Sequence, residues 1–273
     1  MRGAQLPDKT EPKKKRHVVT NIIIIAAIAV LVYSLYNIIY IVGSNTESAN
    51  IYSGLRSYTS VLNTETGAAP SAEGGLTASG GLDLVVDFDA LRTMNEETAA
   101  WIVVPGTEVD YPVVHTDNND YYLNHAADGT ENRAGAIFID ALNAPDFSDQ
   151  NTIVYGHNMQ SGAMFASLHA FEDTAFFNEH TDIYVYTPDG NKRTYRIFSA
   201  FQTNAIGDTY TITFADEASF DQYVADARAK STAPTDVEVK STDKVITLST
   251  CIRGLSTKRY VVHGVLVANE PVL

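Results

Sequence analysis

The chain contains a single cysteine, Cys251, among its 273 residues. No disulfide can form within one chain, so the fold depends on its core alone. Apolar residues make up 45% of the sequence, which is enough to build such a core and excludes a globally disordered chain. A lone cysteine is either an inert buried side chain or a reactive thiol, and outside the cell an unpaired thiol is open to oxidation and needs a chemical reason to be there.

Basic residues are also few, with 19 Lys and Arg against 33 Asp and Glu and a formal net charge of -14. The imbalance is uneven, because residues 1–16 carry a net charge of +4 and the remainder therefore carries -18. An acidic body repels phosphate backbones, so we expect no nucleic-acid partner. One cysteine and scattered histidines do not show the spacing of zinc ligands, so we predict neither a metal site nor a cofactor.

Residues 18–42 form a long apolar run without a charged side chain. A helix of about 25 residues is long enough to cross a hydrocarbon core of about 30 Å. The basic cluster Lys13–Arg16 precedes it, so the positive-inside rule places the amino terminus in the cytoplasm and the later residues outside the cell. A cleavable signal peptide, the alternative, would have a shorter apolar region and a small-x-small cleavage site, which Gly43–Ala49 does not provide.

The segment after this run has two parts. Residues 44–62 place apolar side chains at helical spacing and predict a short amphipathic helix, whereas residues 66–81 are rich in Gly, Ala and Ser and predict a flexible linker. We therefore divide the chain into a cytoplasmic basic tail (1–17), a transmembrane anchor (18–42), a short helix with a flexible linker (43–81) and an extracellular domain (82–273).

The domain from residue 82 onward alternates short apolar runs with turn signals. A short helix is expected over 87–100, ahead of the first strand, and a longer one over 215–230. Strands are predicted at 101–104, 109–114, 136–140, 151–155, 183–186, 192–201, 245–250 and 260–267. Many short strands with regular turns predict a mainly β fold, closed or sandwich-like, with a few added helices.

Cys251 closes the segment VITLSTC, which has the composition of a strand. Strand alternation places its side chain on the same face as those of Val245, Thr247 and Ser249. A loop follows at residues 252–256, so the thiol lies at a strand end, where a reactive group is both rigid and accessible. A cysteine nucleophile needs a thiolate and a proton carrier for the leaving group, which is most often a histidine.

Two of the seven histidines are candidates for the proton carrier. His157 follows the predicted strand 151–155 and Gly156, so it is presented at a strand end on a tight turn. His263 is the alternative, because it shares one strand face with Arg259. A histidine in that position can equally be a structural residue whose hydrogen bonds are satisfied within its strand. The residues by themselves leave this choice open.

Acyl transfer also needs a hydrogen-bond donor for the oxyanion. Arg259 lies eight residues after Cys251, at the beginning of the next strand, so a tight loop would return it toward the cysteine. Its fixed charge would favour the thiolate and stabilise the oxyanion. Arg253 is nearer in sequence, but its loop position predicts a solvated side chain.

Several motifs, in order along the chain, resemble class B sortases. They are GTEVDYPVVHTDNNDYYLNH (106–125), AGAIFID (134–140), YGHNM (155–159), SGAMFASL (161–168), TLSTC (247–251) and KRYVVHG (258–264), and the similarity covers roughly residues 85–268. The resemblance implies a closed sortase β-barrel of about eight strands with added helices, in a membrane-anchored cysteine transpeptidase of Gram-positive bacteria.

The resemblance also implies the chemistry. Cys251, His157 and Arg259 would form the catalytic set, cleaving a carboxyl-terminal sorting signal after Thr, in motifs from Asn-Pro-x-Thr-Asn to Leu-Pro-x-Thr-Gly types. A thioacyl enzyme would then pass the substrate to an amine of a peptidoglycan precursor or to a pilin lysine. Matching positions that would line the substrate groove are Asn119, Leu123, Ser219, Tyr223, Val224 and Ser249.

Two other functions compete with this interpretation. An L,D-transpeptidase would place His-Gly directly before the cysteine, where this chain has Ser249-Thr250. A non-catalytic, membrane-tethered binding domain is a different class, and it predicts an unreactive Cys251.

Overall fold

The computed structural model describes residues 13–61 and 84–272. The predicted linker at 66–81 and the first twelve residues of the basic tail lie outside the described residues. The chain divides into two compact units, Met1–Thr46 and Glu47–Leu273. The second unit includes residues 47–61, which precede the predicted extracellular domain at 82–273.

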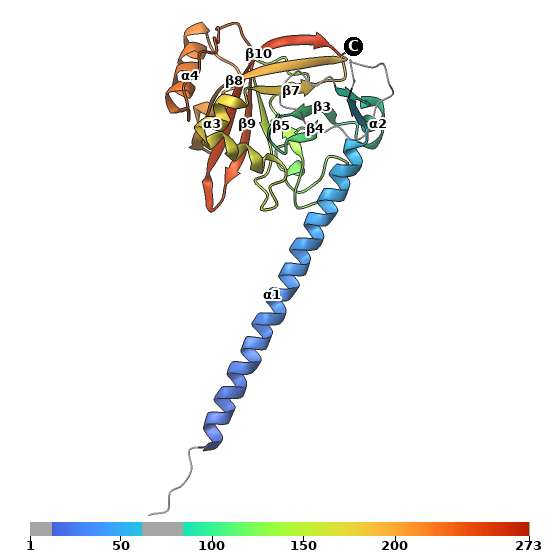
Figure 1. The fold of residues 1–273 in the computed structure, drawn as a ribbon, viewed down its shortest axis with the longest axis vertical. Coiled ribbons are helices and arrows are strands. Elements are labelled where there is room, and N and C mark those ends of the chain that lie inside the picture. Colours follow the sequence, from blue (N-terminus) through green and yellow to red (C-terminus); the bar gives the residue numbers. More distant parts are fainter. Residues whose placement is uncertain (1–12, 62–83, 273) are drawn as a thin grey trace, which may run out of the picture. The chain divides into compact units, whose positions relative to one another are not determined.

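Helix α1 (Lys13–Arg56) is the longest element (Figure 1). The sequence predicts an anchor helix over 18–42 and a short helix within 44–62, and the structure joins them into one. The reason is that Gly43 alone costs only about 1 kcal/mol in a helix and no proline follows it, so the helix continues through residues 44–56. Large apolar side chains of residues 19–42 are exposed, and among the described residues α1 is the one helix long and apolar enough to cross a membrane.

Two small elements precede the barrel. Strand β1 (Thr59–Val61) pairs antiparallel with β2 (Leu84–Val86). Helix α2 (Phe88–Met94) begins after Asp87, whose carboxylate accepts a hydrogen bond from the Ala90 amide, and this N-cap explains the predicted start of the helix. The chain is already a strand from Thr98, earlier than predicted, because every residue of Thr98–Val103 is buried in the sheet.

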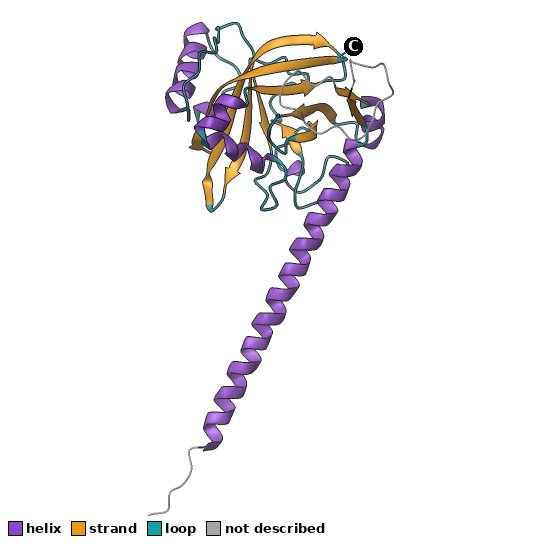
Figure 2. Ribbon diagram, in the orientation of Figure 1, coloured by secondary structure: helices purple, strands orange, loops and turns teal. Residues whose placement is uncertain are grey.

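The described residues of the second unit form a closed barrel in the strand order β10-β8-β7-β3-β4-β5-β6-β9 (Figures 1 and 2). Its strands are β3 (Thr98–Val103), β4 (Asp110–Val114), β5 (Ile137–Ile139), β6 (Asn151–Tyr155), β7 (Asp182–Tyr186), β8 (Asn191–Asn204), β9 (Val245–Ile252) and β10 (Leu255–Pro271). Each predicted strand is present, and the prediction of a closed barrel of about eight strands is confirmed.

The pairing of β9 determines the geometry of one end of the barrel. It runs parallel to β6 on one side, with Tyr155 opposite Ser249, and antiparallel to β10 on the other, with Cys251 opposite Arg259. β10 follows β9 through a short turn, whereas β6 is far from β9 in the sequence. Large apolar side chains such as Trp101, which is fully buried, belong to the main core cluster of the barrel.

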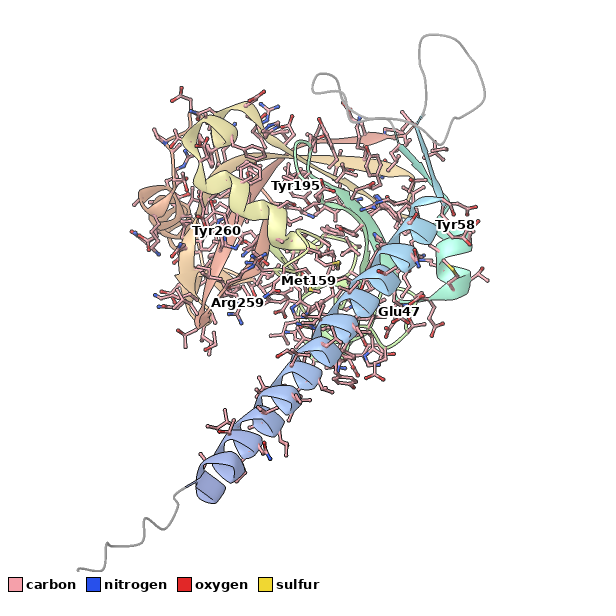
Figure 3. All side chains as sticks on the ribbon, turned by 60° about the horizontal axis from the view of Figure 1, so that its bottom comes forward. Glu47, Tyr58, Met159, Tyr195, Arg259 and Tyr260 are labelled. Carbon is pink, nitrogen blue, oxygen red and sulfur yellow. The ribbon has the colours of Figure 1, made fainter. Side chains whose placement is uncertain are left out.

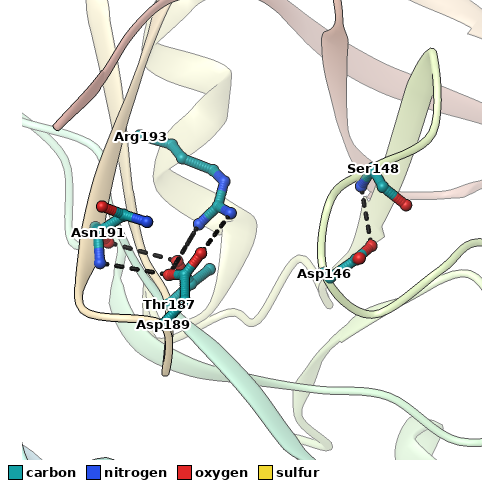
Figure 4. Close-up of polar contacts among 6 residues, drawn as sticks. All are labelled: Asp146, Ser148, Thr187, Asp189, Asn191 and Arg193. Carbon is teal, nitrogen blue, oxygen red and sulfur yellow. Dashed lines mark hydrogen bonds and ion pairs between the residues drawn. The ribbon is translucent and has the colours of Figure 1, made fainter. Parts of the chain in front are cut away.

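Helices and turns cover the barrel. The 3₁₀ helix η1 (Tyr121–Leu123) lies between β4 and β5, whereas η2 (Phe165–Glu172) and α3 (Thr174–Glu179) connect β6 to β7. After β8 come η3 (Asp208–Tyr210) and α4 (Glu217–Lys230), which begins with a capping box between Asp216 and Ser219. The turn between β7 and β8 is held by an ion pair between Asp189 and Arg193 (Figure 4).

Candidate active site

Cys251 lies at the end of β9, one residue before the strand stops at Ile252. Arg253 and Gly254 then turn the chain into β10, and Gly254 adopts the positive φ of 76° that the tight turn requires. The thiol is half-buried, and Cys251 is directly paired with Arg259 across the two strands. Directly opposed residues project their side chains to the same face, so the predicted return of Arg259 toward the cysteine is present in the structure.

His157 reaches the same end of the barrel through parallel pairing. Tyr155 of β6 is opposite Ser249 of β9, and both strands run in the same direction. His157 therefore emerges two residues beyond this pair on one strand and Cys251 two residues beyond it on the other. Gly156, which lies between Tyr155 and His157, cannot carry a side chain, because a Cβ there would lie 2.5 Å from Cδ1 of Ile137 and 2.7 Å from Cγ of Phe165.

Hydrogen bonds connect the segment that carries His157 to the strand that carries Cys251. The Gly156 amide donates to the Ser249 carbonyl over 3.1 Å, and the Thr250 hydroxyl donates back to the Gly156 carbonyl over 2.8 Å. Asn158 donates from Nδ2 to the Cys251 carbonyl over 2.8 Å. Consecutive bonds of this kind fix the backbone on both sides of the cleft.

One ring nitrogen of His157 has a defined partner. Its Nε2 lies 2.7 Å from the carbonyl oxygen of Leu123, in η1. Because a carbonyl oxygen only accepts, Nε2 carries a proton and donates it to Leu123. In the neutral ring Nδ1 is then the basic nitrogen.

The guanidinium of Arg259 is held by its own turn. Its Nη1 donates to the carbonyl oxygens of Ser256 and Lys258, each over 2.9 Å. Figure 3 shows Arg259 next to Tyr260 at the start of β10. Arg253, by contrast, is exposed as predicted, although it donates to the carbonyl of Met159 over 2.9 Å.

Cys251, His157 and Arg259 line one cleft with a volume of about 240 Å³. The other residues that line it are Asn119, Leu123, Phe138, Tyr155, Gly156, Ala205, Ser249 and Thr250. The structure thus brings together all three residues of the predicted catalytic set and three of the six predicted groove residues. Within the part of the chain that the structure describes, no group of three or more His, Cys, Asp and Glu is placed to bind a metal ion.

A carboxylate positions two of the side chains that line the cleft. Asp140 accepts from Nδ2 of Asn119 over 3.1 Å and from the hydroxyl of Tyr155 over 2.9 Å. Burial raises the pKa of Tyr155, and the charge of Asp140 raises it further, so this phenol is neutral and acts as a donor. Asn119 is oriented from its other side as well, because its Oδ1 accepts from the Ala141 amide over 2.8 Å.

Tyr210 in η3 supports Ser249 beneath the cleft. The two hydroxyl oxygens are 2.9 Å apart, and the ring of Tyr210 stacks near that of Tyr155 at a centroid distance of 6.2 Å. Burial raises the pKa of Tyr210 too, so both rings offer neutral polar groups. Neither tyrosine was singled out from the sequence, because Tyr155 had no distinguishing feature beyond its place before Gly156 and Tyr210 lies in a loop without periodicity.

The other candidate histidine, His263, lies in the core. It is fully buried, hydrogen-bonds through Nδ1 to the Ser199 hydroxyl at 3.1 Å and stacks on Phe201 at a centroid distance of 5.3 Å. Burial lowers the pKa of His263 to about 3, and the charge of Lys230 adds to this effect. The structure therefore places His157, and not His263, in the cleft with Cys251.

Three of the predicted groove residues are located elsewhere. Ser219 and Tyr223 line a separate cavity of about 300 Å³ beside α4, and Val224 is packed in the cluster that joins α4 to β8. The hydroxyl of Tyr223 faces inward, within 3.2 Å of Asn151 and 3.3 Å of Thr247. The amphipathic face of α4 is used to cover the barrel, so these side chains do not reach the cysteine cleft.

Comparisons with known proteins agree with this geometry. Residues 102–267 match the sortase domain family. The chain is 35% identical to sortase B of Listeria monocytogenes over 65% of its own length and 72% of the relative. It is also similar to the solved structures of Clostridium perfringens sortase B, with a TM-score of 0.63, 32% identity and coverage of 67% of this chain and 100% of that one. A Staphylococcus aureus sortase B–substrate complex matches with a TM-score of 0.62, 31% identity and coverage of 66% and 84%.

The family match covers most of the barrel, and the similar structures share its fold. The chain has one cysteine, and that cysteine lies in a cleft with a histidine and an arginine. On these grounds the chain belongs to the sortase family, as a class B sortase and thus a cysteine transpeptidase.

Proposed function

We propose that Cys251 is the nucleophile, His157 the proton carrier and Arg259 the oxyanion donor of this transpeptidase. The observation that supports the proposal best is the direct pairing of Cys251 with Arg259, with His157 lining the same cleft. A charge fixed across one strand pair favours a thiolate and lies where an oxyanion would form beside it.

The reaction has two acyl-transfer steps. The Cys251 thiolate attacks the carbonyl carbon of the Thr in a sorting signal, and the resulting oxyanion accepts hydrogen bonds from Arg259. The C–N bond then breaks, and the departing amine takes a proton from His157, leaving a thioester on Cys251. An incoming amine gives up a proton to His157 as it attacks the thioester, so an amide forms and the thiolate is released.

His157 suits this role because its two nitrogens are distinct. Nε2–H is held by the Leu123 carbonyl, which fixes the ring and leaves Nδ1 to exchange the proton. Leu123 would thus serve twice, through its carbonyl for the histidine and through its side chain in the cleft.

The sorting signal would bind along the cleft. Asn119, Leu123 and Ser249 offer an amide, an apolar side chain and a hydroxyl, and the S. aureus structure of similar fold is a sortase B–substrate complex. The signal would be of the Asn-Pro-x-Thr-Asn or Leu-Pro-x-Thr-Gly type, and the acceptor amine would come from a peptidoglycan precursor or a pilin lysine. Ser219, Tyr223 and Val224, predicted from the same resemblance, would act at a distance through α4 if they act on substrate.

The apolar part of α1 would anchor the enzyme in the membrane. Its length and composition suffice for one span, and the preceding basic residues favour a cytoplasmic amino terminus and an extracellular catalytic domain. Surface proteins that carry the signal would then meet the cleft outside the cell.

The test uses the full chain in detergent micelles, fluorogenic peptides of both signal types and an added amine, with products read by mass spectrometry. We expect cleavage after Thr, a thioester adduct on Cys251 and transfer to the amine, all abolished in Cys251→Ala. A folded enzyme with an unreactive thiol and no adduct would instead favour a non-catalytic binding domain. Turnover that persists in Cys251→Ala would refute the nucleophile.

A further inference from the structure

A second histidine contacts the backbone of Cys251 but does not line the cleft. His169 belongs to η2, and its Nε2 lies 3.1 Å from the carbonyl oxygen of Cys251. The same nitrogen is 3.0 Å from Nδ2 of Asn158, which itself donates to the Cys251 carbonyl over 2.8 Å. The side chain of His169 is only 23% exposed, so it is largely packed within the protein.

A carboxylate fixes the orientation of this ring. Nδ1 of His169 lies 2.7 Å from Oε1 of Glu172, one turn further along η2. An ionised carboxylate only accepts, so Nδ1 carries a proton in this arrangement. Because the proton of the neutral ring is on Nδ1, Nε2 is the nitrogen that can accept a hydrogen bond.

Both charge states of the ring hold the Cys251 carbonyl. In the neutral ring Nε2 accepts from the Asn158 amide, which donates its second hydrogen to the Cys251 carbonyl. In the protonated ring Nε2–H donates to the carbonyl directly, beside the bond from Asn158, and a carbonyl has lone pairs for both. The orientation of the Cys251 peptide therefore depends on His169 in either state.

The ring also touches the neighbours of the other two proposed catalytic residues. It stacks on Tyr260, next to Arg259, at a centroid distance of 5.1 Å and an interplanar angle of 27°. Asn158, its hydrogen-bonding partner, follows His157 directly. One side chain thus contacts β9, β10 and the segment after β6, which are the three elements that have to keep their register at the cleft.

We propose that His169, oriented by Glu172, is a positioning residue for the nucleophile: it fixes the Cys251 carbonyl and, through Asn158 and Tyr260, the relative placement of Cys251, His157 and Arg259. The proposal rests on the assignment of Cys251 as the nucleophile. His169 does not touch the substrate, so its loss should slow the formation of the thioester and leave peptide binding largely unchanged.

The experiment compares His169→Ala, His169→Gln and wild type as full chains in detergent, with the best peptide from the panel above. We expect His169→Ala to lower kcat about tenfold, the effect of losing about 1.4 kcal/mol of positioning, with KM changed by less than about twofold. The rate of Cys251 alkylation by iodoacetamide without peptide should fall as well. His169→Gln keeps an amide donor on a side chain of suitable length and should recover most of kcat.

The matched control is His180→Ala, which removes a histidine that packs at a tilt against Phe176, with ring centroids 4.1 Å apart, and does not line the cleft. It should leave kcat and the alkylation rate unchanged. If His169→Ala does not fold, Glu172→Ala decides, since its side chain is 48% exposed, and we expect about a threefold loss of kcat there.

The proposal would be overturned by a wild-type kcat in folded His169→Ala or by an equal loss of kcat in His180→Ala. An unchanged kcat in Glu172→Ala would overturn it as well. A failure of the nucleophile assignment is recognised separately, because Cys251→Ala would then retain turnover.

Discussion

Cys251 and Arg259 are directly opposed across β9 and β10, although seven residues separate them in the sequence. The register shifts between Leu255 and Arg259, so the extra residues of the turn bulge out and leave the arginine opposite the cysteine. The cation is thus positioned by backbone pairing and not by a flexible loop. Its carbonyl partners, Ser256 and Lys258, belong to the same bulge.

Arg259→Lys should therefore lose most of the activity. One ammonium cannot both bond to the bulge carbonyls and reach an oxyanion, and the loss of one oxyanion donor costs about 100-fold or more in kcat. Steady-state kinetics with the peptide measures this. Arg196→Lys is the control, because Arg196 pairs with Asp182 away from the cleft and should keep wild-type kcat. Near-normal turnover in Arg259→Lys would remove Arg259 from the oxyanion role.

Substitution of the two candidate histidines should have opposite effects on activity. His157→Ala should be inactive while still binding peptide, whereas His263→Gln should retain activity, because His263 is buried away from the cleft. Circular dichroism of both variants would check the fold. An inactive but folded His263→Gln, together with an active His157→Ala, would reassign the proton carrier.

His263 should also make stability depend on pH. Burial lowers its pKa to about 3 in the folded state from an ordinary 6.5, so the unfolded chain binds the proton more readily. Stability is then complete above about pH 6.5 and falls by about 1.4 kcal/mol per pH unit as the pH drops toward 3. Urea unfolding followed by the fluorescence of buried Trp101 would measure this slope. His263→Gln should flatten it, and an unchanged slope would assign the effect to another group.

The strands and the Cys251–Arg259 relationship could be predicted because they are local. Apolar alternation and turn residues reveal each strand, and a hairpin returns Arg259 to Cys251 after a few residues. The pairing of β6 with β9 is not local, since the Thr250 hydroxyl bonds to Gly156 across 94 positions. No pattern within either strand encodes that parallel neighbour, so the preference for His157 came from a family resemblance.

Other parts of the site were not foreseen for related reasons. Tyr210 and His169 act through side-chain contacts between elements that the sequence does not show to be adjacent. The two predicted helical segments belong to one continuous helix, α1, because a change of composition near Gly43 does not end a helix. Ser219, Tyr223 and Val224 carry the apolar and capping pattern of α4, which helix packing explains without a ligand.

The turn between β7 and β8 supports a prediction about acid stability. Burial alone would raise the pKa of Asp189, but hydrogen bonds from Arg193, Thr187 and Asn191 outweigh it and lower the pKa (Figure 4). The ionised Asp189 carboxylate therefore stabilises the folded state when the pH is above 3.8, the ordinary pKa of the group. This contribution is lost as the pH falls below that value. Because the side chain is 48% exposed, Asp189→Asn should cost at most about 1 kcal/mol at neutral pH.

Urea unfolding at about pH 7 and about pH 3 would test this, with a smaller difference from wild type expected at the lower pH. Asp146→Asn is the control in the same figure. Hydrogen bonds from Ser148 lower the pKa of Asp146, and the charge of Lys244 adds a smaller effect than the Arg193 ion pair gives Asp189. Its variant should change stability less, and an equal loss would show that Arg193 adds nothing.

Gly135 contacts both Tyr52 of α1 and residues that line the cleft. Tyr52 of α1, in the same compact unit as the barrel, donates to the Gly135 carbonyl over 2.5 Å. Gly135 has a φ of 61°, and a Cβ there would lie 2.5 Å from the Tyr122 carbonyl oxygen, 2.9 Å from that of Leu123 and 3.0 Å from Cδ2 of His157. Any side chain would thus push on both the histidine and the carbonyl that orients it.

Gly135→Ala should lower kcat by about tenfold or more and destabilise the fold by about 1–3 kcal/mol, because backbone atoms cannot move aside cheaply. Gly129→Ala separates the two effects, since Gly129 has a similar φ of 83° but open space around its Cβ position. That control should show the backbone cost alone and keep wild-type kcat. Equal kcat losses in both variants would mean that general strain, and not displacement of His157, limits the reaction. If Gly135→Ala were fully active, the contact between Gly135 and His157 would have no part in orienting the ring.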